Sequence, residues 1–115
     1  MEHFDDLIIL TEREEAYIGL CRCCHTINFV YRNIAIQFTD EEFSYFKAYF
    51  DHLNTEDYLL KSRIGKNIFM ASPTKNIVYC FSKEEIDFLK DLVNEASLML
   101  EVYAILKRVS WMSLG

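Results

Sequence analysis

The sequence predicts an α+β domain of two repeated βββα units, in which two helices pack on one face of an antiparallel sheet and the second helix is longer. Three observations lead to this fold class. A 21-residue segment occurs twice, each copy holds an apolar run of period two, and each run ends at a helix-capping motif. The 115 residues suffice for one buried core, so we expect a single domain over 1–115.

The repeated segment is NIAIQFTDEEFSYFKAYFDHL at residues 33–53 and NIVYCFSKEEIDFLKDLVNEA at residues 76–96, an offset of 43 positions. Six of the 21 positions are identical, where chance would give roughly one, and a fixed offset is typical of a repeated structural unit. The identities pair Asn33, Ile34, Phe38, Glu41, Glu42 and Lys47 with Asn76, Ile77, Phe81, Glu84, Glu85 and Lys90. We expect the two units to span about 16–53 and 58–96.

Each copy predicts a strand that leads directly into a helix. Alternating apolar residues indicate a strand with one buried face, and they are Ile34, Ile36 and Phe38, then Ile77, Tyr79 and Phe81. A hydroxyl residue follows, with a glutamate three positions later, as Thr39 with Glu42 and Ser82 with Glu85. This S/T-x-x-E pattern is a capping box, in which hydroxyl and carboxylate satisfy free amides of the first turn. We therefore interpret these glutamates as helix caps rather than as a catalytic carboxylate set.

The other elements follow from the same patterns. The first unit predicts strands at 16–21, 26–31 and 34–38 and a helix at 40–53, and the second predicts strands at 58–63, 68–71 and 77–81. The acidic N-terminal segment contains an apolar cluster at residues 7–10, which suits either a short strand or a helical turn.

The second helix continues beyond the repeat. Residues 97–108 carry apolar side chains on nearly every side of the helix. One apolar stripe can face the sheet, and the apolar stripe on the other side needs a different partner. A second subunit is the expected partner, and we predict a homodimer interface at Leu100, Tyr103 and Leu106. The alternative is that the N-terminal segment folds across this surface.

Charge and hydropathy exclude several classes of protein. The net charge is −6, of which residues 1–20 contribute −5, and no basic patch suited to nucleic acid is visible. The most apolar stretch, residues 96–106, is about half the length of a membrane span and contains Glu101. No secretory signal pattern begins the chain, so we expect a cytoplasmic protein that binds neither membrane nor nucleic acid.

The reactive side chains gather in one place, Cys21-Arg-Cys23-Cys24-His25, with Cys80 far along the chain. Cys21 and Cys24 have the C-x-x-C spacing of a metal knuckle, and His25 and Cys80 are candidates to complete a zinc site. The alternatives are small thiols in a reducing compartment, or a redox pair. A predicted hairpin disfavours a redox pair of the thioredoxin type, which opens a helix after a strand.

Several motifs together resemble a small bacterial family of unknown function. They are the C-x-x-C pair, the segment from Asn33 to Phe46, the F-x-x-E-E at Phe81 to Glu85, and the N-E-A-x-x-M-L-E-V at Asn94 to Val102. The resemblance covers nearly the whole chain and implies a bacterial cytoplasmic protein in which Cys21 and Cys24 belong to a shared motif. It implies no activity, and His25 stands where such a knuckle usually has glycine.

The function predicted from these observations is a non-catalytic protein-interaction or regulatory module without a cofactor. No phosphate-binding loop, Ser-His-Asp series or H-E-x-x-H motif occurs, so an enzyme is not expected. The alternative is a small zinc-binding protein that uses Cys21 and Cys24 with His25, Cys80 or both.

Overall fold

The computed structural model describes residues 7–53, 68–72 and 74–114, and their side chains as far as Arg108. The chain runs β1 (Leu7–Arg13), β2 (Ala16–Cys21), β3 (Thr26–Tyr31), β4 (Ile34–Phe38), α1 (Asp40–His52), β5 (Ile68–Ala71), β6 (Val78–Phe81) and α2 (Lys83–Leu114). The predicted α+β class and the longer second helix are confirmed.

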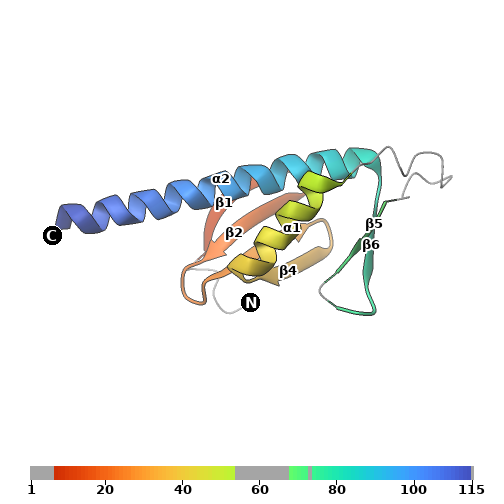
Figure 1. Cartoon of the computed structure of the whole chain (residues 1–115), viewed down its shortest axis with the longest axis horizontal. Coiled ribbons are helices and arrows are strands. Elements are labelled where there is room, and N and C mark those ends of the chain that lie inside the picture. The colour runs from red at the N-terminus through yellow and green to blue at the C-terminus, as the bar shows by residue number, and fades with distance from the viewer. Residues whose placement is uncertain (1–6, 54–67, 73, 115) are drawn as a thin grey trace.

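Strands β1 to β4 form one antiparallel meander in sequence order (Figure 1). The open question about residues 7–10 is answered, because they belong to β1, which pairs with β2 and carries a bulge between Ile9 and Thr11. A short turn at Glu14 and Glu15 joins β1 to β2, and short connections of this kind favour pairing between consecutive strands. The sheet therefore has a fourth strand that the sequence left undecided.

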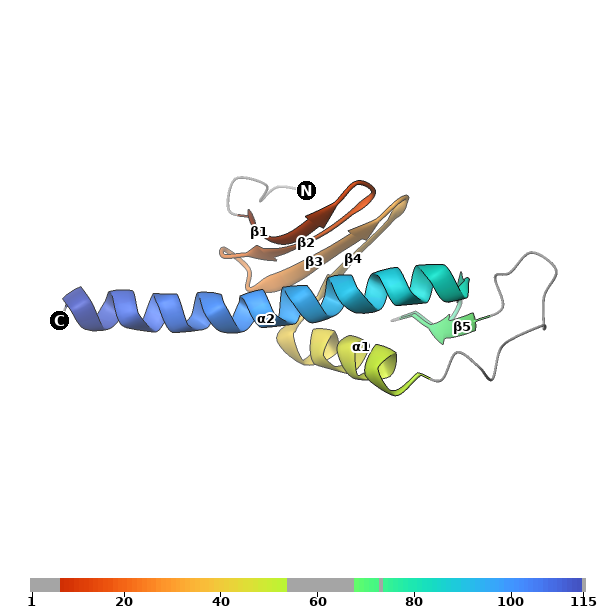
Figure 2. The same cartoon turned by 90° about the horizontal axis from the view of Figure 1, so that it is seen from above.

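Both helices pack on the same face of this sheet (Figure 2). Helix α2 lies over β1 and β2, and α1 lies beside it over β3 and β4. Aromatic rings fill the space under α1, where the centroids of Phe29 and Phe46 are 5.1 Å apart in an edge-to-face contact. Leu89, Leu92 and Val93 supply fully buried side chains from α2, so both helices share one hydrophobic core with the sheet.

The prediction of two equivalent βββα units sharing one sheet is not confirmed. Strands β5 and β6 pair with each other in a separate two-stranded sheet, at the end of the molecule where α2 begins (Figure 1). The predicted strand at 58–63 lies outside the described residues. The local strand-to-helix pattern of the repeat is correct, but the main sheet is completed by β1, which leads into β2 through a short turn, and not by strands of the second unit.

Both predicted capping boxes are present. The Glu42 amide donates to Thr39 Oγ1 at 3.2 Å, and the Thr39 amide donates to Glu42 Oε1 at 2.8 Å. At α2 the Glu85 amide donates to Ser82 Oγ at 3.2 Å, and the Ser82 amide donates to Glu85 Oε1 at 3.0 Å. These bonds fix where both helices begin.

Helix α2 is longer than the sheet that it covers. It has 32 residues and continues past the strands, so that its C-terminal half projects from the body of the protein (Figures 1 and 2). The predicted helical extension at 97–108 is thus present and reaches Leu114. Molecular extents of 59 × 28 × 27 Å reflect this projection.

Candidate functional site

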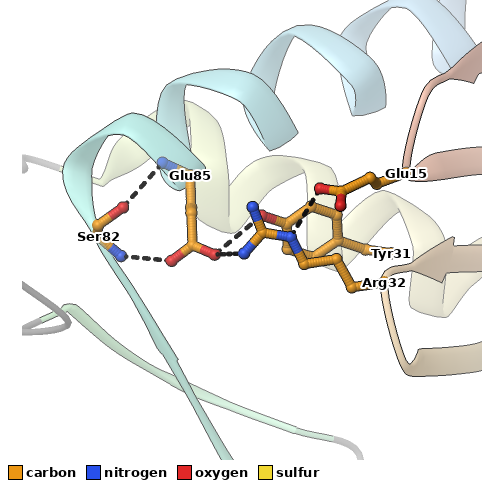
Figure 3. Close-up of polar contacts among 5 residues, drawn as sticks. All are labelled: Glu15, Tyr31, Arg32, Ser82 and Glu85. Carbon is orange, nitrogen blue, oxygen red and sulfur yellow. Dashed lines mark hydrogen bonds and ion pairs between the residues drawn. The ribbon is translucent and has the colours of Figure 1, made fainter.

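The densest polar cluster lies where α2 begins and joins two hairpin turns to the helix (Figure 3). Glu85 is 9% exposed, and its Oε2 accepts hydrogen bonds from Tyr31 Oη at 2.8 Å and from Arg32 Nη1 at 2.9 Å. Arg32 Nε also donates to Glu15 Oε2 at 3.0 Å. We call these four residues, Glu15, Tyr31, Arg32 and Glu85, the junction network.

The backbone of the junction network is itself unusual. Arg32 has φ 54°, in the left-handed region that disfavours residues with a side chain. Its amide donates to the carbonyl oxygen of Glu15 at 2.8 Å, and its guanidinium carbon lies 5.0 Å from the centre of the Tyr31 ring. A residue in this conformation persists where surrounding contacts impose it, and here Glu15 and Glu85 hold the side chain.

The electrostatics of the junction network keep Tyr31 protonated. Burial, reinforced by the hydrogen bond to the Glu85 carboxylate, raises the pKa of Tyr31 to about 12. The hydrogen bond to Glu15 raises the pKa of Arg32 further. Each carboxylate oxygen of Glu85 accepts at least one hydrogen bond, so the network acts as a polar clamp between the sheet and α2.

The junction network borders a depression of about 280 Å³. Its acidic wall comes from Glu14, Glu15, Glu84 and Glu85, and Arg32 supplies a positive charge. The sequence predicted the capping role of Glu85 but not its contacts with Tyr31 and Arg32 in the junction network. Arg32 and Glu85 are 53 positions apart, and no local pattern connects them.

The predicted cysteine cluster forms the hairpin loop between β2 and β3. Cys21 pairs with Thr26 across the hairpin, and the His25 amide donates to the Cys21 carbonyl oxygen at 2.9 Å. His25 has φ 55°, a left-handed conformation that glycine adopts most easily and that explains why a glycine usually follows such a knuckle. The histidine at this position therefore adopts the backbone conformation of the usual glycine, and the turn is kept.

The hairpin loop brings the two knuckle thiols together. Cys21 Sγ and Cys24 Sγ are 2.8 Å apart, with Cys21 2% exposed and Cys24 exposed. Cys24 Sγ is also 3.4 Å from Thr26 Oγ1. Hydrogen bonds lower the pKa of the Cys24 thiol, and the bond with Cys21 contributes more than the bond with Thr26.

The four residues proposed as zinc ligands are not brought together as one set. Cys80 lies opposite Phe69 in the β5–β6 sheet, away from the knuckle. Within 7–53, 68–72 and 74–114, no three His, Cys, Asp or Glu side chains are placed to hold a metal ion. Cys21 and Cys24 are the two predicted ligands that lie together, whereas a structural zinc takes four.

The predicted interface residues on α2 divide between two surfaces. Leu100 and Tyr103 are half-buried and line a groove of about 400 Å³ beside His25 and Leu20. Leu106 is 61% exposed and belongs to an apolar stripe with Leu98, Met99, Val102 and Ile105. Leu100 packs partly against the core, so the unpartnered surface is centred on the other side of the helix.

The sheet has a second, outward face opposite the helices (Figure 2). Asn28 lies on this face, 5% exposed, beside a depression of about 390 Å³ along β3 and β4. Its Oδ1 is buried and has no hydrogen-bond partner among the described residues. This amide is a polar feature that the sequence did not single out.

The fold and these surfaces define a small α+β domain with a polar clamp, a dithiol hairpin and an exposed apolar helix. The chain belongs to the family of unknown function DUF6686, which matches residues 1–109. The predicted resemblance to a family of unknown function is thereby confirmed. No curated protein and no solved structure matches the chain.

In the part of the chain that the structure describes, neither helix has a stretch long and apolar enough to cross a bilayer, although α2 has 32 residues.

Proposed function

We propose that this protein is a non-catalytic interaction module that pairs with a second copy of itself through the C-terminal half of α2. The observation that carries this proposal is the apolar stripe, formed by Leu98, Met99, Val102, Ile105 and Leu106. Leu98, Ile105 and Leu106 are each more than half exposed. Contiguous apolar surface of this kind typically marks a protein interface.

The helical geometry gathers the apolar stripe on one side of α2. At about 100° per residue, its five members fall within an arc of roughly 120°. The buried residues Leu89, Val93 and Ala96 lie on the opposite side of the helix and face the core. One helix thus carries two apolar surfaces, of which the body of the protein covers one.

Charges beside the apolar stripe favour a second copy of this chain in an antiparallel arrangement. Glu101 and Arg108 are exposed and lie along the same edge of the stripe, about two turns apart. In an antiparallel pair, Glu101 of one protomer approaches Arg108 of the other protomer, and the reverse contact follows by symmetry. A parallel pair would place like charges side by side, which is unfavourable.

We assign no catalytic residue, cofactor or metal to the chain. We place the protein in the cytoplasm, since four cysteines present as thiols are typical of reducing compartments.

Self-association is tested by sedimentation equilibrium on matched variants. We expect the wild type to be a dimer and Val102→Glu/Ile105→Glu to weaken association at least about 100-fold, because two charges would be buried in an apolar contact. Lys107→Glu is the control, since it changes net charge by the same amount at an exposed position outside the apolar stripe. Circular dichroism checks that all three proteins keep their helices.

A charge exchange tests the antiparallel arrangement. Glu101→Arg and Arg108→Glu should each weaken the dimer, and the double variant should restore it, because opposite charges face each other again. A wild type that sediments as one chain at its highest soluble concentration contradicts self-association. A dimer that persists in Val102→Glu/Ile105→Glu assigns the interface to another surface.

A further inference from the structure

The hairpin loop between β2 and β3 holds a pair of thiols in contact, with different access to solvent. Cys21 Sγ and Cys24 Sγ are 2.8 Å apart, and no third metal-ligating side chain joins them among the described residues. We infer that Cys21 and Cys24 form a reversible dithiol–disulfide pair that reacts with small soluble disulfides of the glutathione type. This inference goes beyond the proposed self-association and does not depend on it.

The two cysteines are suited to different steps. Cys24 is exposed, so an external disulfide can reach its sulphur, whereas Cys21 is 2% exposed and is shielded from a bulky reagent. Cys24 Sγ also lies 3.4 Å from Thr26 Oγ1, within hydrogen-bond distance for a sulphur atom. Because thiol–disulfide exchange requires that the attacking sulphur reach the external disulfide, Cys24 attacks first and Cys21 resolves.

The reaction balances as two thiol–disulfide exchanges. The Cys24 thiolate attacks one sulphur of R–S–S–R, forming a mixed disulfide and releasing R–S⁻, which takes up the proton that Cys24 had lost. Cys21 then gives up its proton and attacks the Cys24 sulphur, expelling the second R–S⁻, which is protonated in turn. The protein loses two electrons and two protons, and the small disulfide gains both as two R–SH.

The local backbone suits this chemistry. The hairpin pairing of Cys21 with Thr26 and the hydrogen bond from the His25 amide to the Cys21 carbonyl oxygen hold the loop closed, with the two sulphurs 2.8 Å apart. Cys23 and Cys80 are also exposed thiols, so the same alkylation experiment follows them in the same chain.

The inference is tested by equilibrating the full chain with buffers of reduced and oxidised glutathione and quenching with acid. The free cysteines are then alkylated in denaturant at neutral pH, where Cys21 is accessible, and counted by mass spectrometry. We expect a single transition in which the wild type loses two alkylatable thiols and two hydrogen atoms. Peptide mapping should assign the new bond to Cys21 and Cys24. Cys23→Ser, the matched control in the same loop, should titrate like the wild type.

The variants of the pair separate the two roles. Cys21→Ser should accumulate one glutathionyl group on Cys24, because the resolving thiol is lost, and Cys24→Ser should leave Cys21 alkylatable throughout. Circular dichroism verifies that each variant is folded. If Cys21→Ser unfolds, the peptide map of the oxidised wild type and the result for Cys24→Ser, a substitution at an exposed position, test the inference without it.

Three results would overturn the inference. The first is a wild type in which Cys21 and Cys24 both stay alkylatable in oxidising buffer. The second is glutathione that stays bound to Cys24 in the presence of Cys21. The third is stoichiometric zinc binding that protects both thiols from glutathione, which would assign the pair to a metal site.

Discussion

The two strand-to-helix junctions have the same capping motif, yet they perform different tasks. At α1, Glu42 is exposed and its carboxylate caps the helix through the Thr39 amide. At α2, Glu85 makes the same contact with Ser82 through one oxygen and binds Tyr31 and Arg32 through the other. A shared local sequence thus determines the cap, while tertiary surroundings determine whether the capping glutamate also joins distant elements.

The difference arises from what faces each junction. The α2 junction meets two hairpin turns of the main sheet, which present Glu15 and Arg32, and Glu85 is buried between them. A carboxylate removed from water needs compensating donors, and the junction network supplies them. The α1 junction stays in solvent and needs none.

The largest difference is expected between the two capping glutamates. Glu85→Ala should lower the free energy of unfolding by about 3 kcal/mol, because it leaves the buried Tyr31 hydroxyl without its acceptor and removes a capping carboxylate. Glu42→Ala should cost about 0.5–1 kcal/mol, the usual effect of a lost cap. Urea denaturation of both variants measures the difference, and equal losses would show that the junction network adds nothing.

Removing the Tyr31 hydroxyl should have a smaller effect, with a characteristic pH dependence. Tyr31→Phe should cost about 1–2 kcal/mol at neutral pH by removing one buried hydrogen bond to a carboxylate. Because the folded pKa of Tyr31 is about 12 against an ordinary 10, this residue contributes stability below pH 10 that is lost as pH rises through 12.

The pH dependence is measured by urea denaturation between pH 8 and 12. The wild type should lose roughly 2 kcal/mol more than Tyr31→Phe over this window, since each unit of pKa shift corresponds to about 1.4 kcal/mol. Parallel pH profiles for the two proteins would contradict the assignment.

The smallest difference is expected between the capping hydroxyls. Thr39→Ala and Ser82→Ala should each cost about 1 kcal/mol and should agree within about 0.5 kcal/mol, because both hydroxyls accept from one amide at the same distance. Thermal unfolding of the pair measures this equality. A much larger loss for Ser82→Ala would mean that the hydroxyl also supports the junction network.

Much of the fold was predictable because its signals are local. Alternating residues predicted strands at 16–21, 26–31 and 34–38, and the capping boxes placed the helix starts within one residue. The arrangement of β5 and β6 was not predictable in this way. A repeat specifies similar elements, but which strand edge they join depends on contacts with the rest of the chain.

The candidate sites were predictable to a smaller extent. The C-x-x-C spacing predicted a metal knuckle, which stays a prediction, but the two thiols do lie together. Cys21 and Thr26 close a four-residue hairpin loop, and Cys24 lies within that loop, 2.8 Å from Cys21 between the sulphur atoms. Cys80 was grouped with the pair for its residue type, and the topology places it in the other sheet. The contacts of Arg32 with Glu85 have no sequence signature, because they arise from the meeting of a turn and a helix far apart in the chain.

Helix α2 is long enough that a small change of its angle moves its far end noticeably. Its 32 residues extend over about 48 Å at 1.5 Å per residue, and the junction network binds it at the first turn. A tilt of about 5° at that end would displace the far tip by roughly 4 Å, about the width of one side chain. The bond between Glu85 and Arg32, together with the core contacts of Leu89 and Val93, therefore sets the direction in which a surface several turns away is presented.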